Sequence, residues 1–353
     1  MNKKYSELAE LFRSEKTDEE ILDFLLNYHK NDIADMMAGM TEEERKRLYH
    51  LLGAQKVAEI FKYIEEPRKY IRELSVESAA RVISEMDSDD AVDLLEDLDP
   101  EEKEQIVRML DEDAKKDVKM LLSYDEEDIG SCMTTNYICI PEDLTIKQAM
   151  SELVKQAGEN DNIMTIYVVD EKGVFAGAID LKDLIRAREN THLEDLVLKS
   201  YPYVTDHEKI DDCMDRILDY AEDSIPVLSE DKRILGVITS EDLIEMVDNE
   251  MGEDYAKLAG LTAEEDLKET TLQSMKKRMP WLIILLFLGM IVSSVVGIFE
   301  NVVAALPIVI CFQSLILDMA GNVGTQSLAV TIRVLVDENL TLSKKLQLLW
   351  KET

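Results

Sequence analysis

The stretch that decides the architecture reads Lys276-Lys-Arg-Met-Pro-Trp-Leu-Ile-Ile-Leu-Leu-Phe-Leu-Gly-Met-Ile-Val-Ser-Ser-Val-Val-Gly-Ile-Phe299. Three cations open it, and the apolar run from Trp281 to Phe299 contains no charged side chain. At about 1.5 Å per residue, a helix over this run would reach roughly 28 Å, close to the hydrocarbon thickness of a bilayer. We therefore expect a transmembrane helix; a buried helix of a soluble protein is the alternative. The cations predict that its N-terminal side is cytoplasmic.

A second apolar run extends from Val302 to Val336, interrupted by the polar, glycine-bearing stretch from Asp318 to Ser327. As one helix it would reach about 52 Å, well beyond a bilayer core of about 30 Å. We expect this segment to tilt, bend or partly leave the membrane, most readily at Pro307, Gly321 and Gly324.

Asp318, Asn322 and Thr325 would share one face of a helix in this segment. A carboxylate at membrane depth is costly, so it normally faces a watery cavity or a partner. Asp318 is thus a candidate pore residue; the alternative is that it lies at the interface and caps a helix.

The charge of the chain is strongly negative and unevenly distributed. The formal net charge is −35, and residues 276–353 carry seven Lys/Arg against five Asp/Glu, so residues 1–275 carry −37. Such a field argues against a nucleic-acid partner and concentrates divalent cations, although a solvated acidic surface is the usual meaning of an acidic excess. The four cysteines and four histidines show no zinc-site or disulfide spacing.

Two broader expectations follow from what the sequence lacks. The first residues contain no apolar h-region, so we expect no signal peptide and a cytoplasmic acidic portion. Phosphate-binding glycine loops, nucleophile elbows and His-Glu-x-x-His motifs are absent, so we expect no enzyme.

Residues 1–128 have the periodicity of helices throughout and contain an internal repeat. Asp32-Ile-Ala-Asp-Met-Met-Ala-Gly-Met-Thr-Glu-Glu-Glu is echoed by Asp90-Ala-Val-Asp-Leu-Leu-Glu-Asp-Leu-Asp-Pro-Glu-Glu. Repeated helical pairs stack into a superhelix, which we predict for this domain. Most acids at the predicted helix starts are expected to cap those helices.

Two copies of a strand-helix-strand-strand-helix unit follow, over residues 129–195 and 196–248. In the first copy the expected elements are Tyr137–Pro141, Thr145–Gln156, Thr165–Asp170, Phe175–Asp180 and Leu181–Ala187. In the second they are Tyr203–Thr205, Ile210–Tyr220, Ser224–Leu228, Ile234–Thr239 and a helix from Ser240.

The doubled unit resembles a tandem of CBS domains, on Ile225-Pro-Val-Leu and Gly236-Val-Ile-Thr-Ser-Glu-Asp-Leu. The resemblance implies possible contacts of Thr239 and Asp242 with the ribose and phosphates of an adenine nucleotide such as ATP. In the first copy Asp180 replaces the hydroxyl residue and would repel a phosphate.

An acidic helix leaves the second copy and reads Ser240-Glu-Asp-Leu-Ile-Glu-Met-Val-Asp-Asn-Glu-Met-Gly-Glu-Asp-Tyr. Carboxylates at spacings of three and four repel one another along it, and a hard cation with retained waters would relieve that repulsion. A solvated acidic helix is the alternative. We expect a connecting helix over residues 249–275, between the soluble domains and the membrane segment.

The order of these parts is similar to that of the MgtE family of magnesium channels, most specifically at Arg278-Met-Pro-Trp-Leu282 and Gly321-Asn-Val-Gly-Thr-Gln-Ser327. The resemblance implies a multidomain fold: an all-α superhelical N-terminal domain, tandem α/β CBS domains, a long plug helix and an α-helical transmembrane segment over 276–353. It also implies a homodimer in the cell membrane that carries magnesium and closes when Mg²⁺ joins its cytoplasmic domains.

By position, the resemblance also implies site residues. Metal contacts would fall on Asp90, Asp93, Asp211, Asp242, Glu245, Glu250, Glu253 and Asp254. Pore-lining residues would be Asn322, which matches the family asparagine, and Asp318. Because the family has five membrane helices and about two are expected here, we expect a partial chain. A membrane-anchored nucleotide sensor that regulates a partner and conducts nothing is the alternative function.

Overall fold

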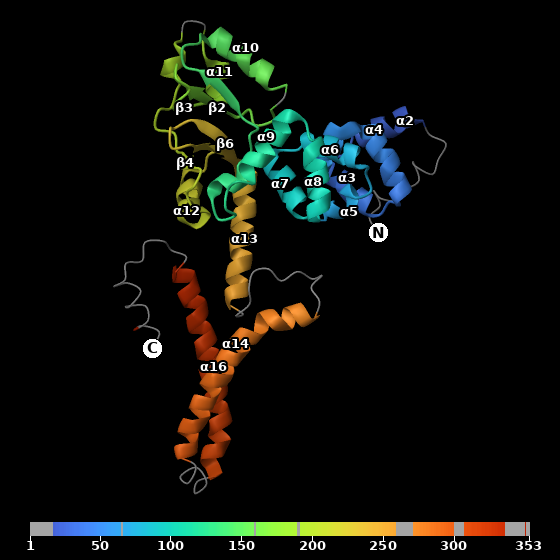
Figure 1. Cartoon of the computed structure of the whole chain (residues 1–353). Helices are drawn as coiled ribbons and strands as arrows, with labels where there is room; N and C mark the ends of the chain where they lie inside the picture. The colour runs from blue at the N-terminus through green and yellow to red at the C-terminus, as the bar shows by residue number, and fades with distance from the viewer. Residues whose placement is uncertain are drawn as a thin grey trace. The chain divides into compact units, whose positions relative to one another are not determined.

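The computed structural model describes residues 17–64, 66–158, 160–188, 191–258, 271–299, 307–335 and 350 (Figure 1). Two compact units divide the chain, residues 1–243 and 244–353. The first unit contains the helical domain and both mixed α/β domains; the second contains the apolar helices. This arrangement confirms the predicted multidomain fold class.

From residue 17 to residue 121, the described elements of the first unit are all helices. They are α2 (Asp18–Leu25), α3 (Lys30–Ala38), α4 (Glu42–Phe61), α5 (Pro67–Ile71), α6 (Val76–Ser84), α7 (Ser88–Glu96), α8 (Pro100–Met109) and α9 (Glu112–Leu121). Helix α6 packs against both α4 and α8, and α7 packs against α9. Each of these helices therefore packs against the helix after the next one in the chain, as in a stacked repeat.

The helix starts only partly follow the capping expectation. Thr17 and Thr41 form reciprocal capping boxes with Glu20 and Glu44, and Asp111 accepts a hydrogen bond from the Ala114 N–H at 2.8 Å. Two further acids, at the starts of α7 and α8, make no such bond. They form ion pairs with basic side chains of preceding helices instead: Asp87 with Lys62, and Asp99 with Arg68 and Arg72.

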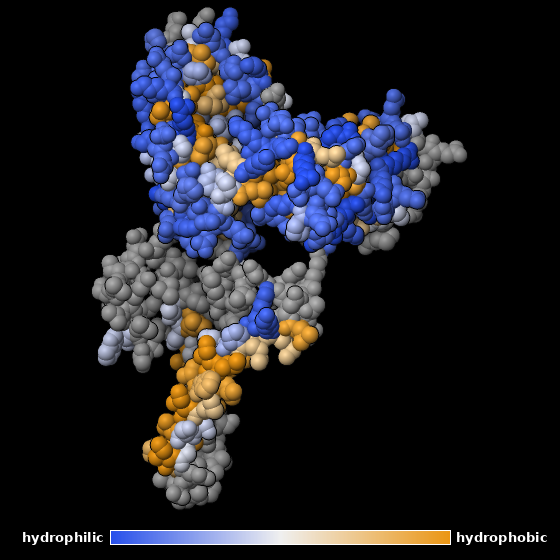
Figure 2. All heavy atoms as spheres, viewed as in Figure 1, coloured by the Kyte–Doolittle hydropathy of each residue, from blue (hydrophilic) through white to orange (hydrophobic). Residues whose placement is uncertain are grey.

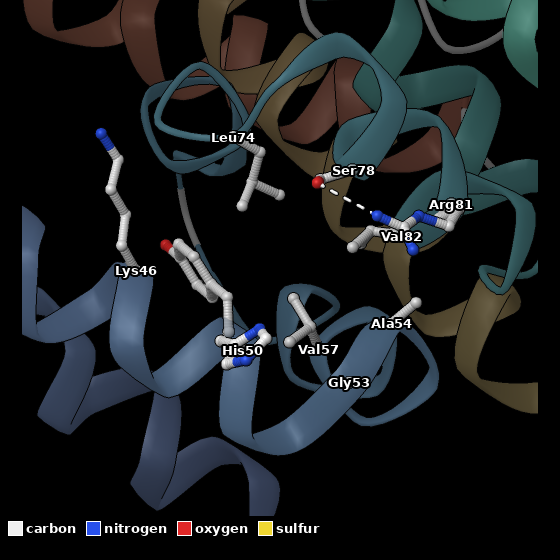
Figure 3. A pocket seen from close by; sticks show the side chains of 10 residues that line it. Lys46, His50, Gly53, Ala54, Val57, Leu74, Ser78, Arg81 and Val82 are labelled. Atoms are coloured by element: carbon white, nitrogen blue, oxygen red, sulfur yellow. Dashed lines mark hydrogen bonds between the residues drawn. The ribbon is translucent and has the colours of Figure 1, made fainter.

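Helix α4 is interrupted at Gly53, whose φ of +77° and ψ of 169° are accessible only to glycine. A pocket of about 350 Å³ lies beside this interruption, with Val57, Leu74 and Val82 among its apolar lining residues (Figure 3). The predicted acidic ligands do not line it.

Two three-stranded sheets make up the mixed domains. The first contains β1 (Ile138–Pro141), β2 (Thr165–Val169) and β3 (Phe175–Asp180), with helices α10 (Ile146–Gln156) and α11 (Leu181–Arg186). The second contains β4 (Val204–Thr205), β5 (Ser224–Leu228) and β6 (Ile234–Thr239), with α12 (Ile210–Tyr220) and α13 (Ser240–Leu258). In each sheet the first pair of strands is parallel and the second antiparallel. Two short 3₁₀ turns, η1 (Ile129–Cys132) and η2 (Leu193–Asp195), complete the order, which confirms the predicted repeat.

The two mixed domains share a buried polar contact. Tyr167 of β2 and Ser224 of β5 are joined by a hydrogen bond of 2.6 Å between their hydroxyls. The Tyr201 hydroxyl donates to the Ser224 carbonyl at 2.8 Å. Because both bonds are buried and satisfied, they fix how the two sheets meet.

A half-buried ion pair between Asp128, just before the first mixed domain, and His207 of the second predicts a pH dependence. His207 Nδ1 lies 3.0 Å from Asp128 Oδ2, and this hydrogen bond raises the pKa of His207 above its ordinary value. The resulting stabilisation is complete below about pH 6.5 and is lost as pH rises through the raised pKa of the folded state. We expect His207→Gln to lower the melting temperature at pH 6, with a gap to wild type that narrows toward pH 8. A gap that stays constant with pH would contradict this assignment.

The second unit contains α13 beyond Leu243, α14 (Thr271–Ile298) and α16 (Pro307–Leu335). Figure 2 shows apolar side chains gathered along α14 and α16, whereas polar side chains cover most of the visible face of the first unit. Among the described residues, one helical segment, Met275–Ile298, is long and apolar enough to cross a membrane. The second apolar run contains α16, which begins at Pro307 and remains helical through Gly321 and Gly324.

Candidate functional site

A network of polar contacts joins the start of α7 to the segment that leads into the first mixed domain. The Thr135 N–H donates to Ser88 Oγ at 2.9 Å, and Asn136 Nδ2 donates to Asp87 Oδ1 at 2.7 Å. The Thr135 hydroxyl also donates to Asp117 Oδ2 of α9 at 2.7 Å. These bonds hold the helical domain against the mixed domains at one defined place.

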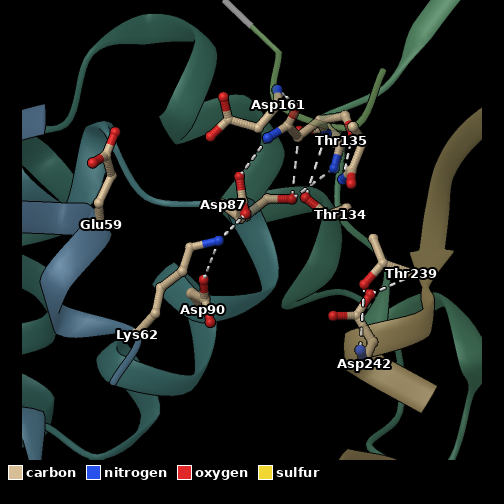
Figure 4. A network of polar contacts seen from close by, with 12 residues as sticks. Glu59, Lys62, Asp87, Asp90, Thr134, Thr135, Asp161, Thr239 and Asp242 are labelled. Carbon is tan, nitrogen blue, oxygen red and sulfur yellow. Dashed lines mark hydrogen bonds and ion pairs between the residues drawn. The ribbon is translucent and has the colours of Figure 1, made fainter. Parts of the chain in front are cut away.

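Acidic side chains converge at this junction. Asp87 is the N-cap of α7, Asp89 and Asp90 lie in its first turn, and Asp242 lies in the first turn of α13. Figure 4 shows the Lys62 ammonium reaching Asp87 and Asp90 from α4, with Thr239 and Asp242 on another element across from them. We call these four carboxylates and Lys62 the junction cluster.

Burial and mutual repulsion disfavour the ionised forms of three aspartates in the junction cluster. Burial, and then the charges of Asp242, Asp90 and Asp87, raise the pKa of Asp89 well above its ordinary value. Burial also raises the pKa of Asp90, although Lys62 opposes the shift. Burial raises the pKa of Asp242 to about 6, despite its hydrogen bonds with Thr239. Crowded, desolvated carboxylates of this kind are relieved by a proton or by a cation.

Asp89 has the least compensation of the four carboxylates. Its Oδ1 atom is buried and has no hydrogen-bond partner, which is rare for a native carboxylate and expensive unless a ligand completes it. The sequence interpretation chose the neighbouring Asp90 and missed Asp89. A usable signal existed, because Asp89 and Asp93 are four residues apart and therefore share one helix face.

Asp93 is exposed on α7, and its charge reaches the same region. Burial first, and then Asp93, Asp242 and Asp89, raise the pKa of the Cys132 thiol to about 11. Cys132 therefore lies near the carboxylates of Asp93, Asp242 and Asp89. Of the predicted ligands, Asp90, Asp93 and Asp242 lie in this region.

The remaining predicted metal ligands lie elsewhere or outside the described part. Asp211 is exposed in the first turn of α12, and Glu245 is exposed on α13. Helix α13 includes Glu250, Glu253 and Asp254, but the structure does not describe their side chains.

The predicted pore-lining and nucleotide-binding residues are either exposed or bonded to each other. Asp318 and Asn322 are exposed on α16. Thr239 and Asp242 engage each other: the Thr239 N–H donates to Asp242 Oδ2 at 2.6 Å, and the Asp242 N–H donates to Thr239 Oγ1 at 3.3 Å. This reciprocal bonding starts α13 in the manner of a capping box.

The junction cluster presents the kind of ligand atoms that a hard cation prefers. Carboxylate oxygens are the ligands preferred by Mg²⁺, which usually retains several waters and needs only one or two carboxylates. The unpartnered Asp89 oxygen and the raised pKa of Asp242 fit such an ion. Within the described residues, no group of three or more His, Cys, Asp or Glu side chains forms a preassembled metal cage, so an ion here would be partly hydrated.

Comparison with known proteins agrees with this layout. The family model of the MgtE intracellular N domain matches residues 28–127, and that of the CBS domain matches residues 127–190 and 193–249. The magnesium transporter MgtE of Enterococcus faecalis is 39% identical over 94% of this chain and 74% of its own length. That of Bacillus subtilis is 31% identical over 65% of this chain. The chain spans 51% of the Bacillus subtilis relative and 49% of the Thermus thermophilus one.

Solved structures show the same fold. The soluble part of a magnesium transporter superposes with a TM-score of 0.67 at 29% identity, covering 70% of this chain and 98% of that one. The cytosolic domain of the Mg²⁺ channel MgtE in complex with ATP gives a TM-score of 0.61 at 26% identity, covering 68% and 99%.

A helical N domain, a pair of CBS domains and an apolar helix after them define the class as a CBS-pair protein with an apolar helical segment. Within that class, this chain is similar to the Enterococcus faecalis relative over most of the length of both chains. The chain belongs to the MgtE family.

Proposed function

We propose that this chain serves magnesium transport across the cell membrane and that its first unit senses magnesium on the cytoplasmic side. The observation that carries the proposal is the junction cluster, in which Asp89 holds a buried carboxylate oxygen without a partner. The names of the relatives, which are magnesium transporters, support magnesium as the ion.

The proposed sensing step is electrostatic. Asp89 and Asp93 of the N domain and Asp242 of the second CBS domain would contact a hydrated Mg²⁺ largely through its retained waters, with Asp90 compensated mainly by Lys62. Without the ion, like charges at this face repel, and the N domain separates from the CBS pair. With it, the docked arrangement is favoured, because the ion binds that arrangement more tightly than the separated one.

Further parts of the proposal concern the segments after the junction. Asp211 and the acids of α13, namely Glu245, Glu250, Glu253 and Asp254, would form additional magnesium contacts that draw this helix toward its neighbours. A homodimer would place two such helices beneath a pore, with Asn322 and Asp318 along it. Liposomes containing the chain and a magnesium-sensitive dye test transport directly.

The sensing step is tested by melting the full chain in detergent with chelator and with millimolar Mg²⁺. We expect Mg²⁺ to raise the melting temperature of the first unit and to slow its proteolysis. Mass action gives about 2.7 kcal/mol at 100 times Kd. Identical melting and cleavage under both conditions would contradict the proposal.

Adenine-nucleotide sensing is a second candidate, because one structural relative was solved with ATP. Thr239 and Asp242 of the second CBS domain would contact the nucleotide, and Asp180 would disfavour a phosphate in the first. Calorimetry with ATP in the absence of Mg²⁺ tests this candidate. Tight binding together with an absent magnesium response would favour a nucleotide sensor over a magnesium gate.

A further inference from the structure

Lys62 occupies an unusual position for a lysine at the end of a surface helix. It follows the last residue of α4, and its ammonium pairs with both Asp87 and Asp90, at 3.3 Å to Asp90 Oδ2. Its side chain is only 28% exposed, so it is not an ordinary solvated lysine. A lysine ammonium is charged at neutral pH, and here two carboxylates pair with it.

The contacts of Lys62 lead directly to the domain junction. Asp87, which it neutralises, also accepts the bond from Asn136 of the segment entering the first CBS domain. Next to it, Ser88 accepts the bond from the Thr135 N–H. The ammonium thus stabilises the turn through which the N domain meets the CBS pair, and it does so without a metal.

A single ammonium leaves most of the local charge in place. Lys62 pairs with Asp87 and Asp90, but Asp89 Oδ1 has no hydrogen-bond partner and Asp242 sits across the junction. One monovalent cation against four carboxylates leaves a net negative remainder at pH 7. The junction cluster is therefore divided into a side compensated by the protein and a side open to a divalent ion.

We propose that Lys62 is a built-in counter-ion that sets how far the N domain and the CBS pair depend on Mg²⁺ for docking. Its charge supports part of the docked population when magnesium is absent. It also weakens the attraction of the junction cluster for a divalent cation. This inference rests on the proposed magnesium-sensing function, and it assigns to Lys62 the setting of the Mg²⁺ concentration at which the domains dock.

The test compares Lys62→Met with wild type in the full chain. Methionine keeps the unbranched stem of the side chain and lacks only its terminal ammonium, so repulsion in the metal-free junction increases. We expect the metal-free melting temperature to fall by roughly 2–6 °C for a unit of this size. The rise induced by Mg²⁺ should become larger than in wild type, because the divalent ion then replaces the missing charge.

Two matched variants sharpen the comparison. Lys62→Arg retains the charge and should stay close to wild type in both conditions. Lys56→Met removes an exposed lysine from the same helix and should change neither the metal-free value nor the magnesium response.

Hydrogen exchange gives a local readout of the same effect. The Thr135 amide is bonded to Ser88 Oγ across the junction, so its exchange reports docking. In Lys62→Met this amide should exchange several-fold faster in chelator and at the wild-type rate in saturating Mg²⁺.

Two results would overturn the inference. A loss of melting temperature that is equal with and without Mg²⁺ would make Lys62 an ordinary structural ion pair. A response identical to that of Lys56→Met would remove any role for its charge. A wild-type chain without any magnesium response would instead contradict the proposed function itself.

Discussion

Replacing Asp89 with asparagine should make the metal-free protein more stable and nearly insensitive to magnesium. The pKa of Asp89 is raised because its charged form is disfavoured by burial and by Asp242, Asp90 and Asp87. Because the pKa is raised in the folded state, ionisation of this carboxyl makes folding less favourable at neutral pH than at low pH, and Asn removes the ionisable group at almost constant volume. The melting temperature in chelator should rise above that of wild type.

The same substitution removes a ligand charge from the proposed ion. Charges about 4 Å apart interact with roughly 1–4 kcal/mol at effective dielectric constants between about 80 and 20. We expect magnesium affinity, measured by calorimetry on the full chain, to weaken roughly 10- to 100-fold. Glu96→Gln, at an exposed position of the same helix, should leave both quantities unchanged. An Asp89→Asn protein with wild-type magnesium affinity would rule Asp89 out as a ligand.

The second large effect is structural and lies within the helical domain. Arg45 is buried on α4, and its Nε donates to Glu73 Oε2 at 2.9 Å, while its Nη1 donates to the Met37 carbonyl at 3.3 Å. The Tyr49 hydroxyl donates to the same carboxylate at 3.3 Å. Glu73→Ala would leave a buried guanidinium without its counter-charge.

Breaking a buried pair from one side typically costs about 3–5 kcal/mol. We expect Glu73→Ala to reduce the free energy of unfolding by that order, as measured by urea denaturation in chelator. The matched control is Glu42→Ala, which breaks the exposed pair with Lys46 at 2.5 Å and should destabilise far less, because solvent screens an exposed pair. Equal losses in the two variants would contradict the assignment of a buried, costly pair.

The fold of the mixed domains was predictable because local signals agree there. Predicted bounds for Phe175–Asp180, Ile210–Tyr220, Ser224–Leu228 and Ile234–Thr239 coincide with those of β3, α12, β5 and β6. Short apolar runs bounded by polar turns, and apolar residues at helical spacing, leave little ambiguity in such segments. In the helical domain, the repeat was predictable, but the use of Asp87 and Asp99 was not. Their ion-pair partners lie 25 to 31 residues away, beyond any local pattern.

The candidate site was predictable in outline only. A resemblance by position led to Asp90, Asp93 and Asp242, and all three lie at the junction. It could not separate Asp89 from Asp90, because both are aspartates in one helix turn. Only packing shows that Asp90 is paired with Lys62, while Asp89 Oδ1 is buried without a partner. Burial and long-range charge are properties of the folded chain.

The central claim is that a divalent cation holds the N domain against the CBS pair. A spin-label distance measurement on the full chain tests it most directly, with labels at Glu43→Cys of α4 and Lys147→Cys of α10, two exposed positions. The account predicts a narrow distance distribution in saturating Mg²⁺ and a broader, longer one in chelator. Asp89→Asn should remove the difference between the two conditions. The same narrow distribution in wild type with and without Mg²⁺ would contradict the account.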